Sequence, residues 1–206
     1  MKVRGTPGSG KTVLAKLLGA HISQQDPDVR IVWIPSWPPN IDESGNKRAE
    51  YDSYLNQKSW VEHEKMVFIF DEAQFTYDDG GLWNEFFKTM HESEGRRRAI
   101  AFASYGSASS RICINGIPIF IPDRQRVTLH RVAHDDGLHP VGLLFTRSEF
   151  DDLVTHLDPS SDFYFDLSFF DALFCITNGH VGAIIGFISI ITVDNVSLFA
   201  LKRLMV

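Results

Sequence analysis

The sequence predicts an α/β fold in three layers, with a parallel β-sheet between two layers of helices. Two fully apolar runs, residues 66–70 and 99–103, have the composition of strands that are buried on both faces. Residues 29–34 read as another strand, and a helix is expected from about Lys11 to Ser23. Strands that alternate with helices along a chain are typical of a parallel sheet covered by helices.

A glycine-rich segment lies between a short strand at residues 1–4 and this helix. Gly5–Thr12 matches the pattern G-x-x-x-x-G-K-[ST], whose backbone N–H groups cradle phosphates at a helix N-terminus. Lys11 is expected to reach the β- and γ-phosphates of a nucleoside triphosphate, and the Thr12 hydroxyl to bind Mg²⁺. The residues predicted to contact the nucleotide are Gly5, Thr6, Pro7, Gly8, Ser9, Gly10, Lys11, Thr12 and Val13.

An acidic pair, Asp71-Glu72, ends the apolar run 66–70. Ligands of open α/β sheets bind at the carboxyl ends of the strands, so both carboxylates are expected beside the phosphates. Asp71 is the predicted Mg²⁺ ligand together with Thr12. Glu72 is the predicted base or orienter for an attacking water molecule.

Further polar residues are expected to complete this site. Ser104 ends the run 99–103 and is predicted to touch the γ-phosphate or the attacking water. Residues 111–121 flank Asn115-Gly116 and predict a β-hairpin inserted at the edge of the site. A fifth strand is expected at residues 126–130. The arginines expected to approach the γ-phosphate, which the sequence does not rank, are Arg111, Arg124 and Arg126.

Helices are predicted outside this core as well. One is expected at residues 49–63 and a shorter one at 82–90, while the triplet Arg96–Arg98 reads as a solvated corner. A helix capped by Thr146 or Ser148 begins a helical segment.

This C-terminal segment continues with helices at 167–177 and 181–192, separated by Asn178-Gly179-His180. The sequence therefore predicts an NTP-binding core over residues 1–145 and a helical lid subdomain over residues 146–206, packed over the nucleotide.

Composition narrows the class of protein. The chain of 206 residues is 44% hydrophobic with a formal net charge of −6, which does not support a broad nucleic-acid-binding face. Cys113 and Cys175 have no metal-ligand spacing and are expected to be reduced and buried, which indicates a reducing intracellular environment.

Neither end of the chain predicts a targeting or membrane segment. No apolar segment follows Met1, so no secretory signal is expected, and polar residues interrupt the apolar stretch 173–193, so a membrane span is not expected. Only about four residues precede Gly5, fewer than the ~5–6 of a usual strand. We therefore expect a truncated first strand in a chain that begins inside a longer protein.

The loop at Gly5–Thr12, the Asp71-Glu72 pair, the polar strand end at Ser104 and the string Thr177-Asn178-Gly179-His180 resemble AAA+ and STAND-type ATPases. The resemblance implies a strand inserted between the loop strand and the Asp strand, and hence the sheet order 5-1-4-3-2. STAND-type lids usually carry Gly-x-Pro where this chain has Gly179-His180-Val181.

Longer strings resemble the NTPase region of Crinkler-type effector proteins of fungi and oomycetes. These strings are Arg4–Thr12, Asp71–Gln74, Leu82–Asn84 and Gly142–Arg147. Such effectors are modular and act inside host cells. The resemblance to their NTPase region implies that the chain binds a nucleotide and that it self-associates or binds a protein partner.

The sequence thus predicts an ATPase that uses ATP and Mg²⁺. The alternative is an ATP-binding conformational switch or interaction module with negligible turnover. A GTPase is disfavoured because the chain lacks Asn-Lys-x-Asp. A helicase would need a second RecA-like lobe, for which the chain is too short. The motifs alone leave phosphoryl transfer to a small molecule open.

Overall fold

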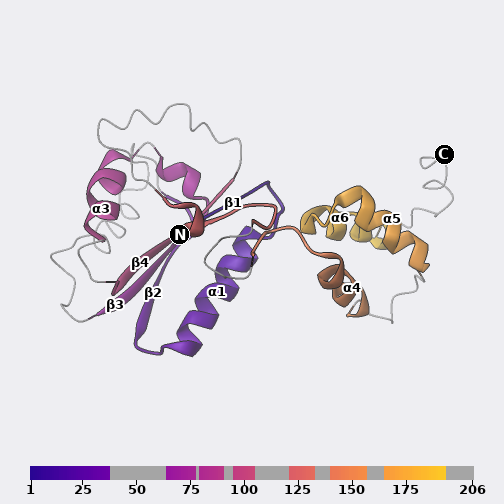
Figure 1. Ribbon diagram of the computed structural model, residues 1–206, viewed down its shortest axis with the longest axis horizontal. Coiled ribbons are helices and arrows are strands. Elements are labelled where there is room, and N and C mark those ends of the chain that lie inside the picture. The colour runs from indigo at the N-terminus through magenta and orange to yellow at the C-terminus, as the bar shows by residue number, and fades with distance from the viewer. Residues whose placement is uncertain are drawn as a thin grey trace. The chain divides into compact units, whose positions relative to one another are not determined.

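The computed structural model describes residues 1–37, 64–77, 79–90, 95–104, 121–132, 140–156 and 165–193 (Figure 1). The described residues do not include the predicted helix at 49–63 or residues 111–120 of the predicted hairpin, which contain Arg111 and Cys113.

The chain forms two compact units, which are described separately. The first comprises Met1–Thr6 and Lys11–Thr128, and the second comprises Pro7–Gly10 and Leu129–Val206. Residues 129–145, which the sequence analysis assigns to the core, therefore group with the C-terminal helices.

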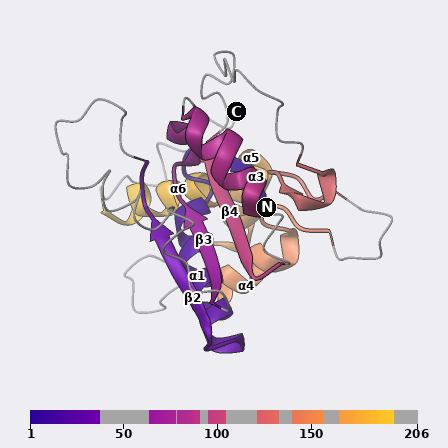
Figure 2. The same ribbon diagram turned by 90° about the vertical axis from the view of Figure 1, so that its left-hand side faces the viewer.

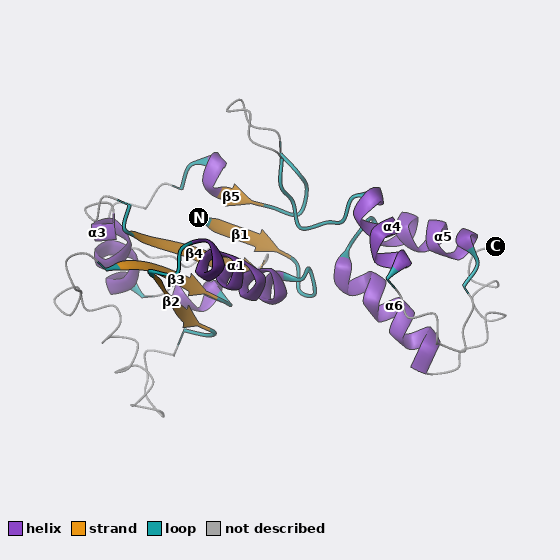
Figure 3. Ribbon diagram, turned by 90° about the horizontal axis from the view of Figure 1, so that it is seen from below, coloured by secondary structure: helices purple, strands orange, loops and turns teal. Residues whose placement is uncertain are grey.

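The first unit contains a five-stranded, all-parallel sheet with the order β2-β3-β4-β1-β5. Figure 2 shows β2, β3 and β4 side by side, and Figure 3 shows β5 beside β1. The predicted α/β fold with a parallel sheet is confirmed. The strands are β1 (Lys2–Gly5), β2 (Val29–Ile34), β3 (Lys65–Phe70), β4 (Arg97–Ser104) and β5 (Arg126–Val127).

Strand β1 lies between β4 and the edge strand β5. On one side Gly5 lies opposite Ser104 of β4, and on the other Lys2 lies opposite Arg126 of β5. Ser104 is therefore placed at the end of β1 where the 5–12 loop begins, and Arg126 is placed at the other end.

Two strands differ from the prediction at one end. β4 starts earlier than expected, because Arg97 and Arg98 pair with Met66 and Val67 of β3 and do not form a solvated corner. β5 stops earlier than residue 130, because the carbonyl oxygen of Leu129 accepts hydrogen bonds from the N–H groups of Leu143 and Leu144.

One face of the sheet packs against α1 (Lys11–Gln25). A Cβ atom added to Gly19 would lie 3.3 Å from Cδ1 of Ile69 and 3.8 Å from Cγ2 of Ile31, so the helix backbone lies close to β2 and β3. Only Lys11, Ala15 and Gly19, spaced four residues apart, are buried in α1. The buried stripe of the helix is therefore narrow, and the small residues Ala15 and Gly19 let the helix backbone lie close to the sheet.

The other face carries an aromatic cluster. Side chains alternate along a strand, so Phe68 and Phe70 lie on the face opposite to Ile69. There they pack against the π-helical turn η3 (Leu82–Phe86) and α3 (Phe87–Thr89), with the Phe68 and Phe86 rings 5.0 Å apart. Helices on both faces are compatible with the three-layer arrangement.

The second unit contains α4 (Arg147–Thr155), α5 (Leu167–Thr177) and α6 (Val181–Val193), close to the predicted ranges. Phe150, Phe170, Leu173 and Ile184 form its core.

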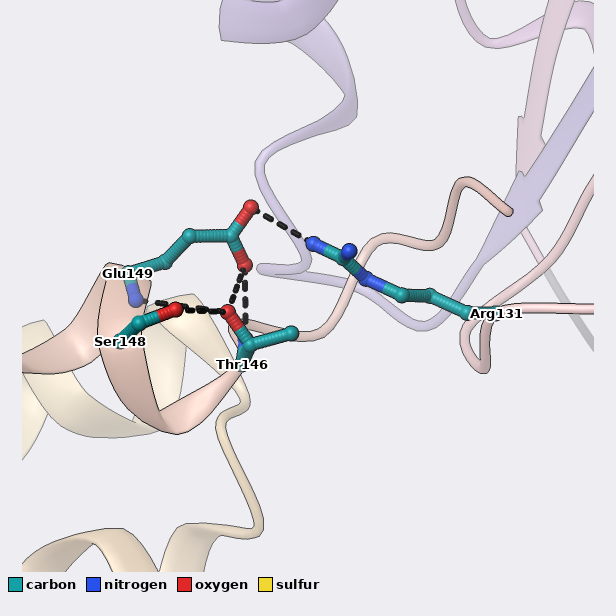
Figure 4. A network of polar contacts seen from close by, with 4 residues as sticks. All are labelled: Arg131, Thr146, Ser148 and Glu149. Atoms are coloured by element: carbon teal, nitrogen blue, oxygen red, sulfur yellow. Dashed lines mark hydrogen bonds and ion pairs between the residues drawn. The ribbon is translucent and has the colours of Figure 1, made fainter. Parts of the chain in front are cut away.

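Thr146 is the N-cap of α4. Its hydroxyl accepts from the Glu149 N–H, while Glu149 Oε2 accepts from the Thr146 N–H and Oε1 from Arg131 (Figure 4). This capping box fixes where the helix begins.

Two observations concern the predictions from composition. Cys175 is a free, exposed cysteine on α5, so the expectation that it is buried was wrong. Within the described ranges, no helix combines the length and the apolar character that a membrane crossing requires.

Candidate functional site

Lys11 lies at the junction between the 5–12 loop and α1, and its side chain is buried with 6% exposed. Its Nζ donates hydrogen bonds to the carbonyl oxygens of Thr6 at 2.8 Å and Gly5 at 3.3 Å. Burial lowers the pKa of the ammonium group, whereas the nearby carboxylates of Glu72 and Asp71 raise it. The buried Lys11 ammonium group therefore interacts electrostatically with both carboxylates of the acidic pair.

The loop backbone needs glycine at two positions. Gly8 has φ +73° and Gly10 has φ +79°, conformations that L-residues with side chains rarely adopt. A Cβ atom on Gly10 would meet no atom within 4 Å, so its φ angle, and not a lack of space, requires glycine. Between them, the Ser9 hydroxyl is buried and has no hydrogen-bond partner among the described residues.

The acidic pair follows β3 directly. The Asp71 N–H donates to the Ile34 carbonyl oxygen of β2, and Asp71 is buried with 5% exposed. Its Oδ1 accepts from the Glu72 N–H at 3.0 Å, which orients the carboxylate. Glu72 has φ 47° and ψ 40°, a left-handed conformation that is uncommon for a residue other than glycine. Such a residue costs of order 1–3 kcal/mol, so the surrounding contacts must hold it.

A residue to which the sequence analysis gave no role lies between the acidic pair and β4. Gln74 is on the 3-10 turn η2 (Ala73–Thr76), where its Nε2 donates to Glu72 Oε2. Its Oε1 accepts from the Ser104 N–H at 3.0 Å. Gln74 therefore joins Glu72 to the carboxyl end of β4. The sequence placed Gln74 two residues after the Glu72 carboxylate, at the end of the string Asp71–Gln74, but gave no sign of its contact with β4.

The other residues predicted for the site lie on different elements of the first unit. Thr12 and Val13 lie in the first turn of α1 and are exposed. Arg124 lies on the exposed 3-10 turn η6 (Asp123–Gln125). Arg126 pairs with Asp123 at 3.1 Å and lies beside Lys2, at the end of β1 away from the loop. Its expected role at a γ-phosphate gains no support from this register.

The tip of the 5–12 loop approaches the start of α6 within the second unit. A Cβ atom on Gly8 would lie 3.6 Å from both Gly182 Cα and His180 Cε1, and one on Gly182 would overlap the Gly8 carbonyl oxygen. The His180 Nδ1 accepts from the Ala183 N–H at 3.2 Å. Glycine at both contact positions therefore allows the two backbones to meet.

No group of three or more His, Cys, Asp or Glu side chains is arranged to hold a metal ion in the part of the chain that the structure describes. Neither a protein-family model nor a curated protein matches the chain.

Proposed function

We propose that the chain binds ATP at the 5–12 loop and hydrolyses its β–γ phosphoanhydride bond in the presence of Mg²⁺. The observation that carries the proposal is the buried Lys11 ammonium, which donates to two carbonyl oxygens of the loop and interacts with Glu72 and Asp71. A buried cation at a strand–loop–helix junction suits a polyphosphate, which would supply acceptors of full negative charge.

Three further features support a nucleotide at this loop. The left-handed Gly8 and Gly10 permit inward-pointing N–H groups, and the buried Ser9 hydroxyl has an unused donor. The sheet order β2-β3-β4-β1-β5, read from the other edge, is the order 5-1-4-3-2 that the resemblance to AAA+ and STAND-type ATPases implies. We also propose that the chain is related to the NTPase region of Crinkler-type effectors, which its sequence resembles.

The residues at hand also fit Mg²⁺. The exposed Thr12 hydroxyl and the buried, oriented Asp71 carboxylate are the kind of oxygen donors that Mg²⁺ prefers, and they would hold it. When bound, the ion would neutralise charge that develops on the phosphate oxygens.

Glu72 would orient the attacking water. The water oxygen forms a bond to the γ-phosphorus while the bond to the β–γ bridging oxygen breaks, which leaves ADP and phosphate, and the water proton passes to the Glu72 carboxylate. Lys11 and the loop N–H groups would stabilise the negative charge on the transferring group. Ser104, opposite Gly5 in the register, is the polar residue of β4 nearest to this chemistry in the sheet.

Phosphate release from Mg²⁺-ATP by the wild-type chain, beside Glu72→Gln and Lys11→Ala, tests the proposal. We expect turnover in the wild type, ATP binding without turnover in Glu72→Gln, and no binding in Lys11→Ala. Competition with GTP determines the base preference. Binding without turnover in the wild type would favour the ATP-binding switch, and unchanged ATP affinity in Lys11→Ala would overturn the assignment of the loop.

A further inference from the structure

We propose that Gln74 is a positioning residue that sets the Glu72 carboxylate for water attack and ties it to the end of β4. This inference rests on the proposed function and goes beyond it by assigning a role to a side chain for which the sequence analysis predicted none. All three residues concerned, Glu72, Gln74 and Ser104, belong to the first compact unit.

The two hydrogen bonds of Gln74 require an amide. Its Nε2 donates to the Glu72 carboxylate, and its Oε1 accepts from the Ser104 backbone N–H at 3.0 Å. An ionised carboxylate only accepts and a backbone N–H only donates, so the two partners together determine which way the amide faces. A carboxyl side chain at position 74 could keep the bond to Ser104 but would repel Glu72. An apolar side chain could form neither bond.

The surrounding backbone is arranged to keep this contact. Glu72 adopts a left-handed conformation immediately before η2, which carries Gln74. The Phe75 N–H donates to the Glu72 carbonyl oxygen at 3.0 Å, which closes the first turn around the acidic residue. The Glu72 side chain is therefore held from both its backbone and its carboxylate, and such preorganisation lowers the reorganisation needed at the moment of reaction.

Ser104 gives the contact its significance for the site. It lies opposite Gly5, the first residue of the 5–12 loop, in the register of β4 and β1. The Ser104 N–H that binds Gln74 thus belongs to the strand end beside the loop. Through Gln74, the orientation of the Glu72 carboxylate depends on a backbone group of the strand next to the loop. Gln74 itself need not touch the nucleotide.

The test compares Gln74→Met and Gln74→Glu with wild type in steady-state ATP hydrolysis. We expect kcat to fall roughly ten- to hundredfold in both variants, with the KM for ATP changed less than about threefold, because Gln74 acts through Glu72 and not on binding. The exposed Gln24→Met is the matched control and should keep the wild-type kcat. A wild-type or raised kcat in Gln74→Met would overturn the inference.

The pH profile separates positioning from a general structural effect. In Gln74→Glu, lowering the pH adds a proton to one carboxyl of the new pair and restores a donor between them, so the deficit relative to wild type should shrink. Gln74→Met has no such group and should keep its deficit at every pH. Parallel profiles for the two variants would contradict the positioning role, and thermal unfolding of each variant checks that it is folded.

A measurement without nucleotide keeps this inference distinct from the proposed function. The side-chain amide NMR signals of Gln74, identified by their loss in Gln74→Met, should shift in Glu72→Ala but not in Glu85→Ala, which removes an exposed glutamate of η3. If ATP is neither bound nor hydrolysed while this shift occurs, the proposed function fails although the contact exists. If ATP is hydrolysed and Gln74→Met turns over normally, only the positioning role fails.

Discussion

The ammonium nitrogen of Lys11 lies 2.8 Å from the carbonyl oxygen of Thr6, so in this structure the loop's own backbone provides the acceptor for its buried cation. Carbonyl oxygens carry only partial charge, and a phosphate would be a stronger acceptor for the same N–H groups. If the proposed site binds ATP, we expect phosphate oxygens to replace these carbonyl oxygens as acceptors of the Lys11 N–H groups.

Replacing Lys11 tests this exchange. Lys11→Met keeps the length of the side chain and removes the charge, so we expect ATP affinity to fall by about a hundredfold or more, since a charge-assisted contact is lost. Calorimetric titration with Mg²⁺-ATP measures the change. Lys16→Met on the exposed side of α1 is the control, and its affinity should match wild type.

Lys2 predicts a pH dependence of stability. Burial and the neighbouring Arg4 and Arg126 lower the pKa of Lys2 to about 8, from 10.5 in an exposed lysine. Between these values the unfolded chain binds more protons than the folded chain, so this group makes the folded state more stable as the pH rises. Lys2→Met should raise the urea midpoint at pH 7 and reduce the gain between pH 7 and pH 10.

Tryptophan fluorescence can report this transition, since Trp33, Trp37 and Trp83 lie in the first unit. The Lys2 ammonium lies 4.7 Å from the centre of the Tyr77 ring, so the substitution also removes a cation–π contact. A lower midpoint at pH 7 would mean that this contact outweighs the cost of burying the charge, which would contradict the prediction.

The apolar runs predicted the strands of the sheet, but the sequence did not predict which residues of neighbouring strands pair with each other. Residues 66–70 and 99–103 read directly as strands because both of their faces are buried. The added pairs at Arg97 and Arg98 carry no apolar signal, since both residues that extend β4 beside β3 are charged. In the same way, no local pattern showed that Leu129 binds Leu143 and Leu144 and thereby ends β5.

The residues of the candidate site likewise fall into those that local sequence patterns predict and those that only strand pairing brings together. Spacing alone was enough to predict Lys11, Asp71 and Glu72 as candidates, because the loop and the strand end are local patterns. The contact between Gln74 and Ser104 spans 30 residues and exists only once β3 and β4 are adjacent. The place of Arg126 beside Lys2 likewise follows from strand pairing and not from its distance along the chain.

Two glycines of the second unit should respond to substitution in opposite ways. Gly179 has φ +75°, and a Cβ atom there would overlap the carbonyl oxygen of Phe145, whose N–H donates to the Gly179 carbonyl oxygen at 2.9 Å. We expect Gly179→Ala to lower the free energy of unfolding by about 2 kcal/mol or more.

Gly186 is the matched control. It lies inside α6, and a Cβ atom there would meet nothing within 4 Å, so Gly186→Ala should raise the free energy of unfolding by about 0.5–1 kcal/mol. Far-UV circular dichroism during urea unfolding measures both changes. Equal effects of the two substitutions would show that the backbone conformation at Gly179 is not the one described.

The capping box of α4 predicts a loss of stability in acid. The Thr146 backbone N–H, which donates to Glu149 Oε2 at 2.7 Å, lowers the pKa of the Glu149 carboxyl, and the Thr146 hydroxyl and Arg131 lower it further (Figure 4). A carboxyl with a lowered pKa stabilises the folded state fully above its ordinary pKa, and the stabilisation is lost as the pH falls through the folded-state value.

Removal of the hydroxyl by Thr146→Ala should lower the free energy of unfolding by about 1 kcal/mol near pH 7 and by less in acid, because protonated Glu149 no longer completes the box. Ser148→Ala, which leaves both bonds of the box in place, should show little pH dependence relative to wild type in the same denaturation series. If Thr146→Ala cost the same at pH 3 as at pH 7, Glu149 would not be coupled to the cap.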